Sequence, residues 1–494
     1  MLDELRACAR VIGTASGRLF FVAFVGLSVV QMLSGCIFSS ERPDLALDVP
    51  PAYRAGRGYS APPALDWWRG FRSTELTGLV EEAQTRNLDI AVAIALIIQA
   101  DAQSKIARAP LLPTATLNAT DQHSRPSQTT GPDGVRTGGG PSESQLYNTV
   151  LNASYEIDFW GKNLAASRAA QESAIVSRFN KEVVVLSTVV SVAAAYFQVL
   201  ASQDRLRVAR DNLSAASRIL TLIKQRFEAG TASQLDVAQQ ESLVATVRAS
   251  IPPLDQTMRQ NIATLAVLIA RAPYGVMVKG GSLFRLATPR VTPGLPSELL
   301  FQRPDIRAAE AALASTDASV ESARAAFFPS ITLTGQGGYA SSVLKLLFRP
   351  ESLLYDVATN LTQPILDGFR LEGQLELAKG QQLAALESYR RAVLSAFGDV
   401  ERALIAVADT TEQERLQRQV VASSRQAFQI AETRLREGTI DLVTVLQTQQ
   451  TLFTAEDNLV IVRLVRFQAI LSLFQALGGS WLPPGVDARA NVLQ

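Results

Sequence analysis

Residues 88–117, LDIAVAIALIIQADAQSKIARAPLLPTATL, align without gaps with residues 304–333, PDIRAAEAALASTDASVESARAAFFPSITL. Twelve of the 30 aligned positions are identical. They include a shared Asp, a shared Arg and a shared Pro: Asp89/Asp305, Arg108/Arg324 and Pro113/Pro329. Alanine-rich sequences match by chance more easily than these three residues do. The chain therefore contains an internal duplication whose unit is far longer than a solenoid repeat.

The second part of each copy aligns at an offset of 208 residues instead of 216. The matched residues are Arg226, Gly230, Thr231 and Val237 with Arg434, Gly438, Thr439 and Val445. We therefore predict two structural repeats, 73–280 and 281–482. A leader (1–35) and an extension (36–72) precede them, and a tail (483–494) follows.

Each copy is predicted to begin with an alanine-rich helix, 87–110 or 303–327, which a proline ends. Strand pairs follow, at 114–120 and 146–157 in the first copy and at 330–336 and 355–365 in the second. Thr, Asn and Gln alternate along them with Leu, Val and Ala, a pattern typical of a membrane barrel wall. Four strands cannot close a barrel, so several chains would have to contribute. Ordinary two-stranded hairpins are the alternative.

Two very long helices are predicted next, 162–228 and 370–436, each on the order of 100 Å at 1.5 Å per residue. A seven-residue apolar period predicts that they form coiled-coil seams. The seam residues are Leu206, Leu213, Leu220 and Phe227, with Ala209, Ala216 and Ile223, in the first copy, and Val421, Phe428 and Leu435 in the second.

Both long helices are expected to turn back at a glycine, at Gly230-Thr231 and at Gly438-Thr439, because glycine tolerates the left-handed C-cap conformation. The return helices are predicted at 233–271 and 441–477. In the first of them, Pro252-Pro253 is expected to break the helix.

An uncharged stretch, Val183 to Leu200, is nearly long enough to span a membrane. The equivalent stretch of the second copy, Arg391 to Ala408, carries Asp399, Glu401 and Arg402. Since equivalent segments share an environment, a buried helix is favoured over a membrane span.

Composition argues against several classes of protein. Lys plus Arg is 47 and Asp plus Glu is 46, so the charge gives no footprint for nucleic acid. The single histidine, His123, makes a histidine metal site improbable. The sequence contains no phosphate loop or nucleophile elbow, and its paired carboxylates are interpreted as solvated helix faces. We predict neither an enzyme nor a cofactor.

The N-terminus has the pattern of a bacterial export signal. Arg6, Arg10 and Arg18 accompany an apolar stretch, Leu19 to Leu33, that is short for a membrane span. Leu33-Ser34-Gly35-Cys36 resembles a lipobox, which predicts lipidation of Cys36. Ile37 follows where inner-membrane lipoproteins carry Asp. An uncleaved anchor with a chance cysteine is the alternative.

Several motifs along the mature chain are similar to those of the TolC-like outer membrane efflux proteins, in particular the NodT-type lipoproteins of resistance–nodulation–division pumps. The motifs are Tyr155–Gly161, Gln363–Arg370, Leu295–Leu300 with Arg303–Ile306, and Leu477–Trp481. Lys162 and Gln302 stand where arginine is usual. The order and spacing of the four motifs along the chain make the resemblance specific.

This resemblance implies a mostly α-helical homotrimer in the outer membrane, with a 12-stranded β-barrel built from four strands per chain. A periplasmic α-barrel of long antiparallel coiled-coil helices would continue it. The turns at Gly230, Thr231, Gly438 and Thr439 would dock onto a periplasmic adaptor protein, which links the channel to an inner-membrane efflux transporter.

The family often carries an acidic ring at the closed periplasmic aperture. Here Thr444 and Gln447 occupy positions where acids are common, while Asp236 and Asp441 lie nearby. We expect the gate to use these aspartates or to be polar.

The predicted function is the passive exit duct of a tripartite pump for drugs, toxic compounds or metal ions. An outer-membrane channel for one-step protein secretion and a lipid-anchored coiled-coil scaffold are the alternatives. A scaffold explains the heptads and Cys36 but not the strand pairs at matched points of both copies.

Overall fold

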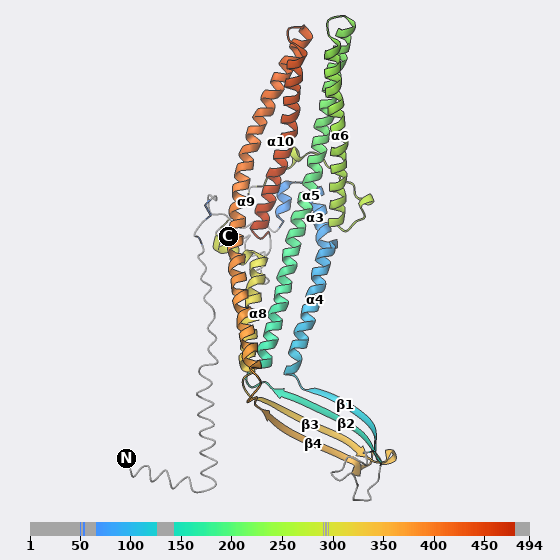
Figure 1. Cartoon of the computed structure of the whole chain (residues 1–494), viewed down its shortest axis with the longest axis vertical. Coiled ribbons are helices and arrows are strands. Elements are labelled where there is room, and N and C mark those ends of the chain that lie inside the picture. Colours follow the sequence, from blue (N-terminus) through green and yellow to red (C-terminus); the bar gives the residue numbers. More distant parts are fainter. Residues whose placement is uncertain are drawn as a thin grey trace, which may run out of the picture. The chain divides into compact units, whose positions relative to one another are not determined.

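The computed structural model describes residues 50, 53–54, 66–125, 143–289, 291, 294 and 296–479. These residues form two compact units. Unit 1 holds the described parts of 100–174 and 312–386, and unit 2 those of 46–99, 175–311 and 387–494. In both copies the chain runs through a helix, two strands, a very long helix and a return helix (Figure 1).

Unit 1 is built on one antiparallel sheet in the order β1-β2-β3-β4 (Figure 1). Its strands are β1 (Thr114–Ser124), β2 (Ser144–Ile157), β3 (Ser330–Ser341) and β4 (Leu353–Thr362). All four predicted strands are confirmed. The last one ends earlier than expected because Pro364 has no amide to continue the ladder.

Strand pairing gives the sheet two different faces. One row across the four strands is Leu117, Leu151, Gly337 and Tyr355, and the adjacent row is Thr116, Asn152, Gln336 and Asp356. Successive residues of a strand point to opposite faces, so the apolar and polar rows lie on opposite sides. Leu117 is 69% exposed and Tyr355 83% exposed. The predicted two-sided pattern is confirmed.

The junction between β2 and the first long helix contains the Tyr155–Gly161 motif. The Asp158 carboxylate accepts hydrogen bonds from the backbone amides of Asn163 (3.0 Å) and Leu164 (2.7 Å), which caps the helix. The Trp160 indole stacks on Phe328 and donates to the Pro329 carbonyl at 2.9 Å. The motif therefore ties β2 to the start of β3.

The helices follow the predicted ranges closely. The alanine-rich helices are α4 (Leu88–Arg108) and α8 (Pro304–Ala325), and the long ones are α5 (Lys162–Glu228) and α9 (Arg370–Glu437). The return helices are α6 (Gln234–Leu268) and α10 (Leu442–Ala476).

The predicted break at Pro252-Pro253 is wrong, because α6 continues through both prolines. Both prolines are exposed, as are the preceding residues Arg248 and Ala249. Carbonyl groups that lose an amide partner at a proline are thus on the solvent side, where water can bind them.

The core of unit 2 gathers around Phe71, Phe197 and Phe467. Much of Val183 to Leu200 is buried in this core, which confirms the interpretation of that stretch as a buried helix. By length and composition alone, three described helices are apolar enough to cross a membrane: Thr74–Leu111, α5 and α10. Three further elements were not predicted from the sequence: α3 (Thr74–Arg86), α7 (Pro296–Gln302) and the turn at Trp67–Phe71.

The coiled-coil seam is only partly as predicted. In the second copy Val421, Phe428 and Leu435 are buried. In the first copy Phe227 is 42% exposed, so its assignment to the seam is wrong. The predicted seam residues Leu206, Ala209, Ala216 and Ile223 are buried there, and so is Ile219, which was not assigned to the seam. The α-helical period of 3.6 residues drifts from a strict seven-residue repeat, which carries the buried stripe away from Phe227.

Several predictions lie outside the described residues. They are the leader 1–35, the lipobox with Cys36, most of the extension 36–72, the end of the Leu477–Trp481 motif and the tail 483–494.

Candidate functional site

Both long helices end in the same glycine turn, in unit 2. Gly230 and Gly438 adopt φ angles of 74° and 75°, a left-handed conformation that a β-carbon would strain. The same hydrogen bond closes each turn: the Thr231 amide to the Arg226 carbonyl at 2.8 Å, and the Thr439 amide to the Arg434 carbonyl at 3.0 Å. The glycine C-caps are confirmed, whereas adaptor docking by these turns stays a prediction.

The two candidate gate aspartates begin the return helices. The Asp236 carboxylate accepts hydrogen bonds from the Ser233 amide and hydroxyl, both at 2.8 Å, and forms a capping box. Asp441 is the N-cap of α10 and accepts from the Thr444 amide at 2.7 Å. This backbone hydrogen bond lowers the pKa of Asp441 below its ordinary value. The aspartates are not equivalent, since Ser233 aligns with Asp441 and Asp236 with Thr444.

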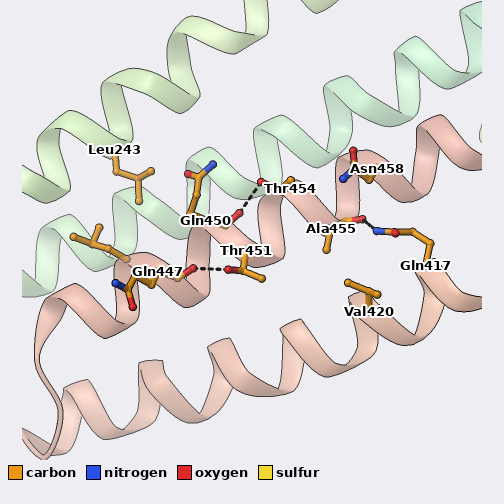
Figure 2. A pocket seen from close by; sticks show the side chains of 10 residues that line it. Leu243, Gln417, Val420, Gln447, Gln450, Thr451, Thr454, Ala455 and Asn458 are labelled. Carbon is orange, nitrogen blue, oxygen red and sulfur yellow. Dashed lines mark hydrogen bonds between the residues drawn. The ribbon is translucent and has the colours of Figure 1, made fainter.

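Gln447 lines a groove of about 900 Å³ between α6, α9 and α10 (Figure 2). Its polar lining consists of amide and hydroxyl side chains: Gln417, Gln447, Gln450, Thr451, Thr454 and Asn458. The two threonine hydroxyls donate to carbonyls of their own helix, and Gln417 donates to the Ala455 carbonyl at 3.0 Å. In the described part of the chain, the amides of Gln447, Gln450 and Asn458 remain available to a solute.

A buried carboxylate holds the hairpin of α9 and α10 together. Glu414 is 1% exposed and accepts hydrogen bonds from three guanidinium groups: Arg463 at 2.6 Å, Arg418 at 2.6 Å and Arg466 at 2.9 Å. Burial by itself raises the pKa of Glu414, but the three arginines outweigh it and lower the pKa to about 2. Glu414 is therefore ionised at neutral pH.

The segment that connects the two copies is anchored from both of them. Arg463 donates to the carbonyls of Leu283 (3.0 Å) and Leu286 (3.3 Å). From the first copy, the buried Asp204 carboxylate accepts from the Leu283 amide at 2.9 Å and the Ser282 hydroxyl at 3.1 Å. The interpretation of the carboxylates as solvated is thus wrong for Asp204 and Glu414. The missed signal was a pair of arginines within the apolar helix α10.

Two motifs far apart in the sequence meet in unit 2. Arg303 donates to the Ala476 carbonyl and to Asp399, both at 3.1 Å, and pairs with Asp305. A β-carbon at Gly478 would lie 2.6 Å from the Gln302 carbonyl oxygen, so only glycine fits there. These motif residues therefore have a structural role.

Among the described residues, no group of three or more His, Cys, Asp or Glu side chains is arranged to hold a metal ion.

Comparison with known proteins identifies the class. The family model described as outer membrane efflux protein matches residues 79–271 and 295–479. The pyoverdine export outer membrane protein OpmQ of Pseudomonas aeruginosa is 38% identical over 460 residues, which cover 92% of this chain and 96% of OpmQ. The toluene efflux pump outer membrane protein TtgF of Pseudomonas putida is 32% identical over 418 residues, 84% of this chain and 86% of TtgF.

A solved structure agrees with these relatives. The MtrE outer membrane channel of Neisseria gonorrhoeae has a TM-score of 0.78 and 28% identity, and covers 89% of this chain and 97% of MtrE. Fold and relatives together define an outer-membrane channel for efflux. The chain belongs to the outer membrane efflux protein family, whose members are channels rather than enzymes. It is located in the outer membrane and acts as the exit channel of an efflux pump.

Proposed function

We propose that three copies of the chain form one continuous duct, in which each copy contributes β1–β4 to a 12-stranded barrel and two helical hairpins to a periplasmic tunnel. The observation that supports this proposal most directly is the four-stranded sheet with an exposed apolar face. Within the described residues its edge strands β1 and β4 have one neighbour each, and four strands are too few to close a barrel. Pairing of β4 with β1 of the next copy closes it and removes the free edges.

The assembly is tested by the mass of the purified protein in detergent and by conductance in a planar bilayer. We expect a trimeric mass and discrete conductance steps. A monomeric mass with no conductance would contradict the proposal.

The duct connects through its glycine turns to a periplasmic adaptor and, through the adaptor, to an inner-membrane transporter. Support comes from the exposed, doubly repeated turns and from the family of the chain. A photoreactive residue at Ser233 or Ile440 is expected to capture the adaptor in cells. Tyr274, which is 95% exposed outside the turns, is the control position. Capture of the channel's own protomers alone from both turns would contradict docking.

The exported compound belongs to the small molecules. The names of OpmQ and TtgF mention pyoverdine and toluene, which supports a siderophore-like chelator or an apolar solvent as cargo. A deletion strain distinguishes the two: it loses chelator from the medium in the first case and becomes solvent-sensitive in the second. A loss of secreted proteins instead would indicate the one-step secretion alternative.

Cys36 remains the proposed lipid anchor. Labelled palmitate is expected to enter the wild-type protein but not a Cys36→Ala variant, and labelling of that variant would exclude the assignment.

A further inference from the structure

The two glycine turns of one chain are linked by an arginine. Arg226, in the last turn of α5, donates from Nη2 to the Arg436 carbonyl at the end of α9, at 3.3 Å. The same nitrogen is 3.6 Å from the position that a β-carbon at Gly438 would take. The last carbonyls of a helix lack intrahelical partners and carry the negative end of its dipole. Arg226 of the first hairpin therefore binds the open end of the second.

The second hairpin has an equivalent arginine, Arg434, but its guanidinium does not donate to a carbonyl in the described part of the chain. Arg434 aligns with Arg226 at the offset of 208, and the two turns share their φ angles and hydrogen bonds. Arg226 is half-buried, whereas Arg434 is exposed. In the described part of the chain, the Arg434 guanidinium makes no hydrogen bond or ion pair. Among the described residues, Arg226 and Arg434 are thus equivalent donors, but only Arg226 has a carbonyl acceptor, that of Arg436.

We propose that Arg434 donates to the Glu228 carbonyl of a second copy of this chain, so that a ring of arginine-to-carbonyl contacts joins the turns alternately within and between protomers. The inference rests on the proposed three-fold assembly. Around such a ring, first and second hairpins alternate. The step from first to second hairpin lies within one chain and uses Arg226 and the Arg436 carbonyl. The next contact around the ring joins the second hairpin of one chain to the first hairpin of its neighbour. At the offset of 208, the equivalent donor is Arg434 and the equivalent acceptor is the Glu228 carbonyl.

The other strong polar link between the hairpins is not repeated. Arg205 on α5 binds Asp457 on α10 with two hydrogen bonds, of 2.7 and 3.0 Å. The offset of 208 replaces these residues by Gln413 and Ala249, which cannot form an ion pair. The arginine-to-carbonyl contact is thus the polar link that both steps have in common. This hydrogen bond joins neighbouring hairpins at their glycine turns. It has to break when the duct widens and the turns move apart.

Paired cysteines test the contact directly. Glu228→Cys with Arg434→Cys samples the step between chains, and Arg226→Cys with Arg436→Cys is the matched pair within one chain. The only native cysteines are Cys8 and Cys36, and the full chain with no added cysteine is the background control. Because an arginine side chain reaches further than a disulfide, outer-membrane preparations of each are treated with a short bis-maleimide that joins the two thiols, and are separated on a denaturing gel.

We expect covalent dimers and trimers from the first pair, and an internally crosslinked, monomeric band from the matched pair. If the protein has a trimeric native mass and the matched pair is crosslinked, but the first pair stays monomeric, the contact is refuted while the channel assembly stands. A monomeric native mass refutes both the contact and the assembly.

Conductance gives a second, independent readout. Arg434→Ala and Arg226→Ala are both expected to raise the basal conductance of the closed channel. Arg434→Lys, which keeps a cationic donor, is expected to restore much of the closed state. Wild-type conductance of Arg434→Ala alongside a raised conductance of Arg226→Ala would overturn the equivalence of the two steps.

Discussion

Glu414 illustrates how one residue fixes the position of several elements. Its carboxylate receives three guanidinium groups, and Arg463 extends the network to the carbonyls of the connecting segment. The guanidinium of Arg463 also lies over the rings of Phe284 and Phe467, at 4.9 and 5.2 Å from their centroids. Removal of the carboxylate leaves the buried Arg463 guanidinium without a counter-charge, which costs more than the ion pair itself contributes.

We therefore expect Glu414→Gln to destabilise the helical part of the protein by about 3 kcal/mol. The measurement is the loss of helical circular dichroism on thermal or denaturant unfolding in detergent. Glu412→Gln is the matched control, because Glu412 is 56% exposed and pairs with the equally exposed Arg415. Equal stability of the two variants would show that the network is dispensable.

The same carboxylate predicts acid sensitivity. The pKa of Glu414 falls from 4.5 to about 2 in the folded protein. A lowered pKa contributes stability that is complete above pH 4.5 and is lost as the pH falls toward 2. The unfolding midpoint of the wild type is expected to drop across this window, and that of Glu414→Gln to drop less. Parallel curves would contradict the assignment.

Asp236 and Asp441 combine two roles that substitution can separate. Asn keeps an oxygen acceptor for the cap but removes the charge, whereas Ala removes both. If the aspartates form an acidic constriction, the double variant Asp236→Asn with Asp441→Asn loses cation preference in planar bilayers at unchanged thermal stability. Unchanged ion preference in that variant, with instability only in the double Ala variant, would leave capping as their sole role.

At the scale of elements, much of the architecture follows from local pattern. The duplication, the four strands and the helical hairpins were predictable because period, proline and glycine signals agree along both copies. Short elements such as α7 were missed, since seven residues contain too little period to detect. The path through Pro252-Pro253 and the burial of Glu414 depend on which side of a helix meets the core. That information is tertiary and absent from local pattern.

The candidate site divides in the same way. The glycine turns and the starts of the return helices lie where the sequence predicts them, because they depend on neighbours a few residues away. The capping roles of Asp236 and Asp441 were not predicted, since the sequence pattern suggested these residues only as a gate. The groove around Gln447 and Gln450 combines three helices, of which α6 belongs to the other copy, so no local signal identifies it.

Two adjacent glycines of β3, Gly337 and Gly338, should respond differently to substitution by alanine. A β-carbon at Gly338 would meet the Thr149 carbonyl oxygen and lie 2.7 Å from the Val150 Cα, both backbone atoms of β2. Gly337 has open space. Gly338→Ala is expected to weaken the pairing of β2 and β3 by roughly 1–3 kcal/mol, the usual cost of overpacking, and to lower the yield of folded channel. Gly337→Ala should fold normally; equal yields would exclude the close approach.

At the scale of the whole molecule, the apolar face of the sheet is the surface that the proposed barrel would turn toward lipid. Exposed apolar side chains cover that face on three strands, among them Leu117, Leu151, Tyr355 and Val357. Their neighbours in sequence, which include Asn118, Asn152 and Asp356, lie on the opposite face. In a barrel that spans a membrane, the first face contacts acyl chains and the second lines the water-filled lumen.

Leu117 and Asn118 test this orientation with the same substitution on opposite faces. A lysine at a lipid-facing position costs up to about 2–4 kcal/mol near the middle of the bilayer, whereas a lumen-facing lysine stays hydrated. We expect Leu117→Lys to reduce the amount of heat-resistant trimer in the outer membrane. Asn118→Lys should assemble normally and shift the ion preference of the conducting channel toward anions, since it adds one positive charge per chain to the lumen. Assembly that survives Leu117→Lys but fails with Asn118→Lys would reverse the faces of the sheet.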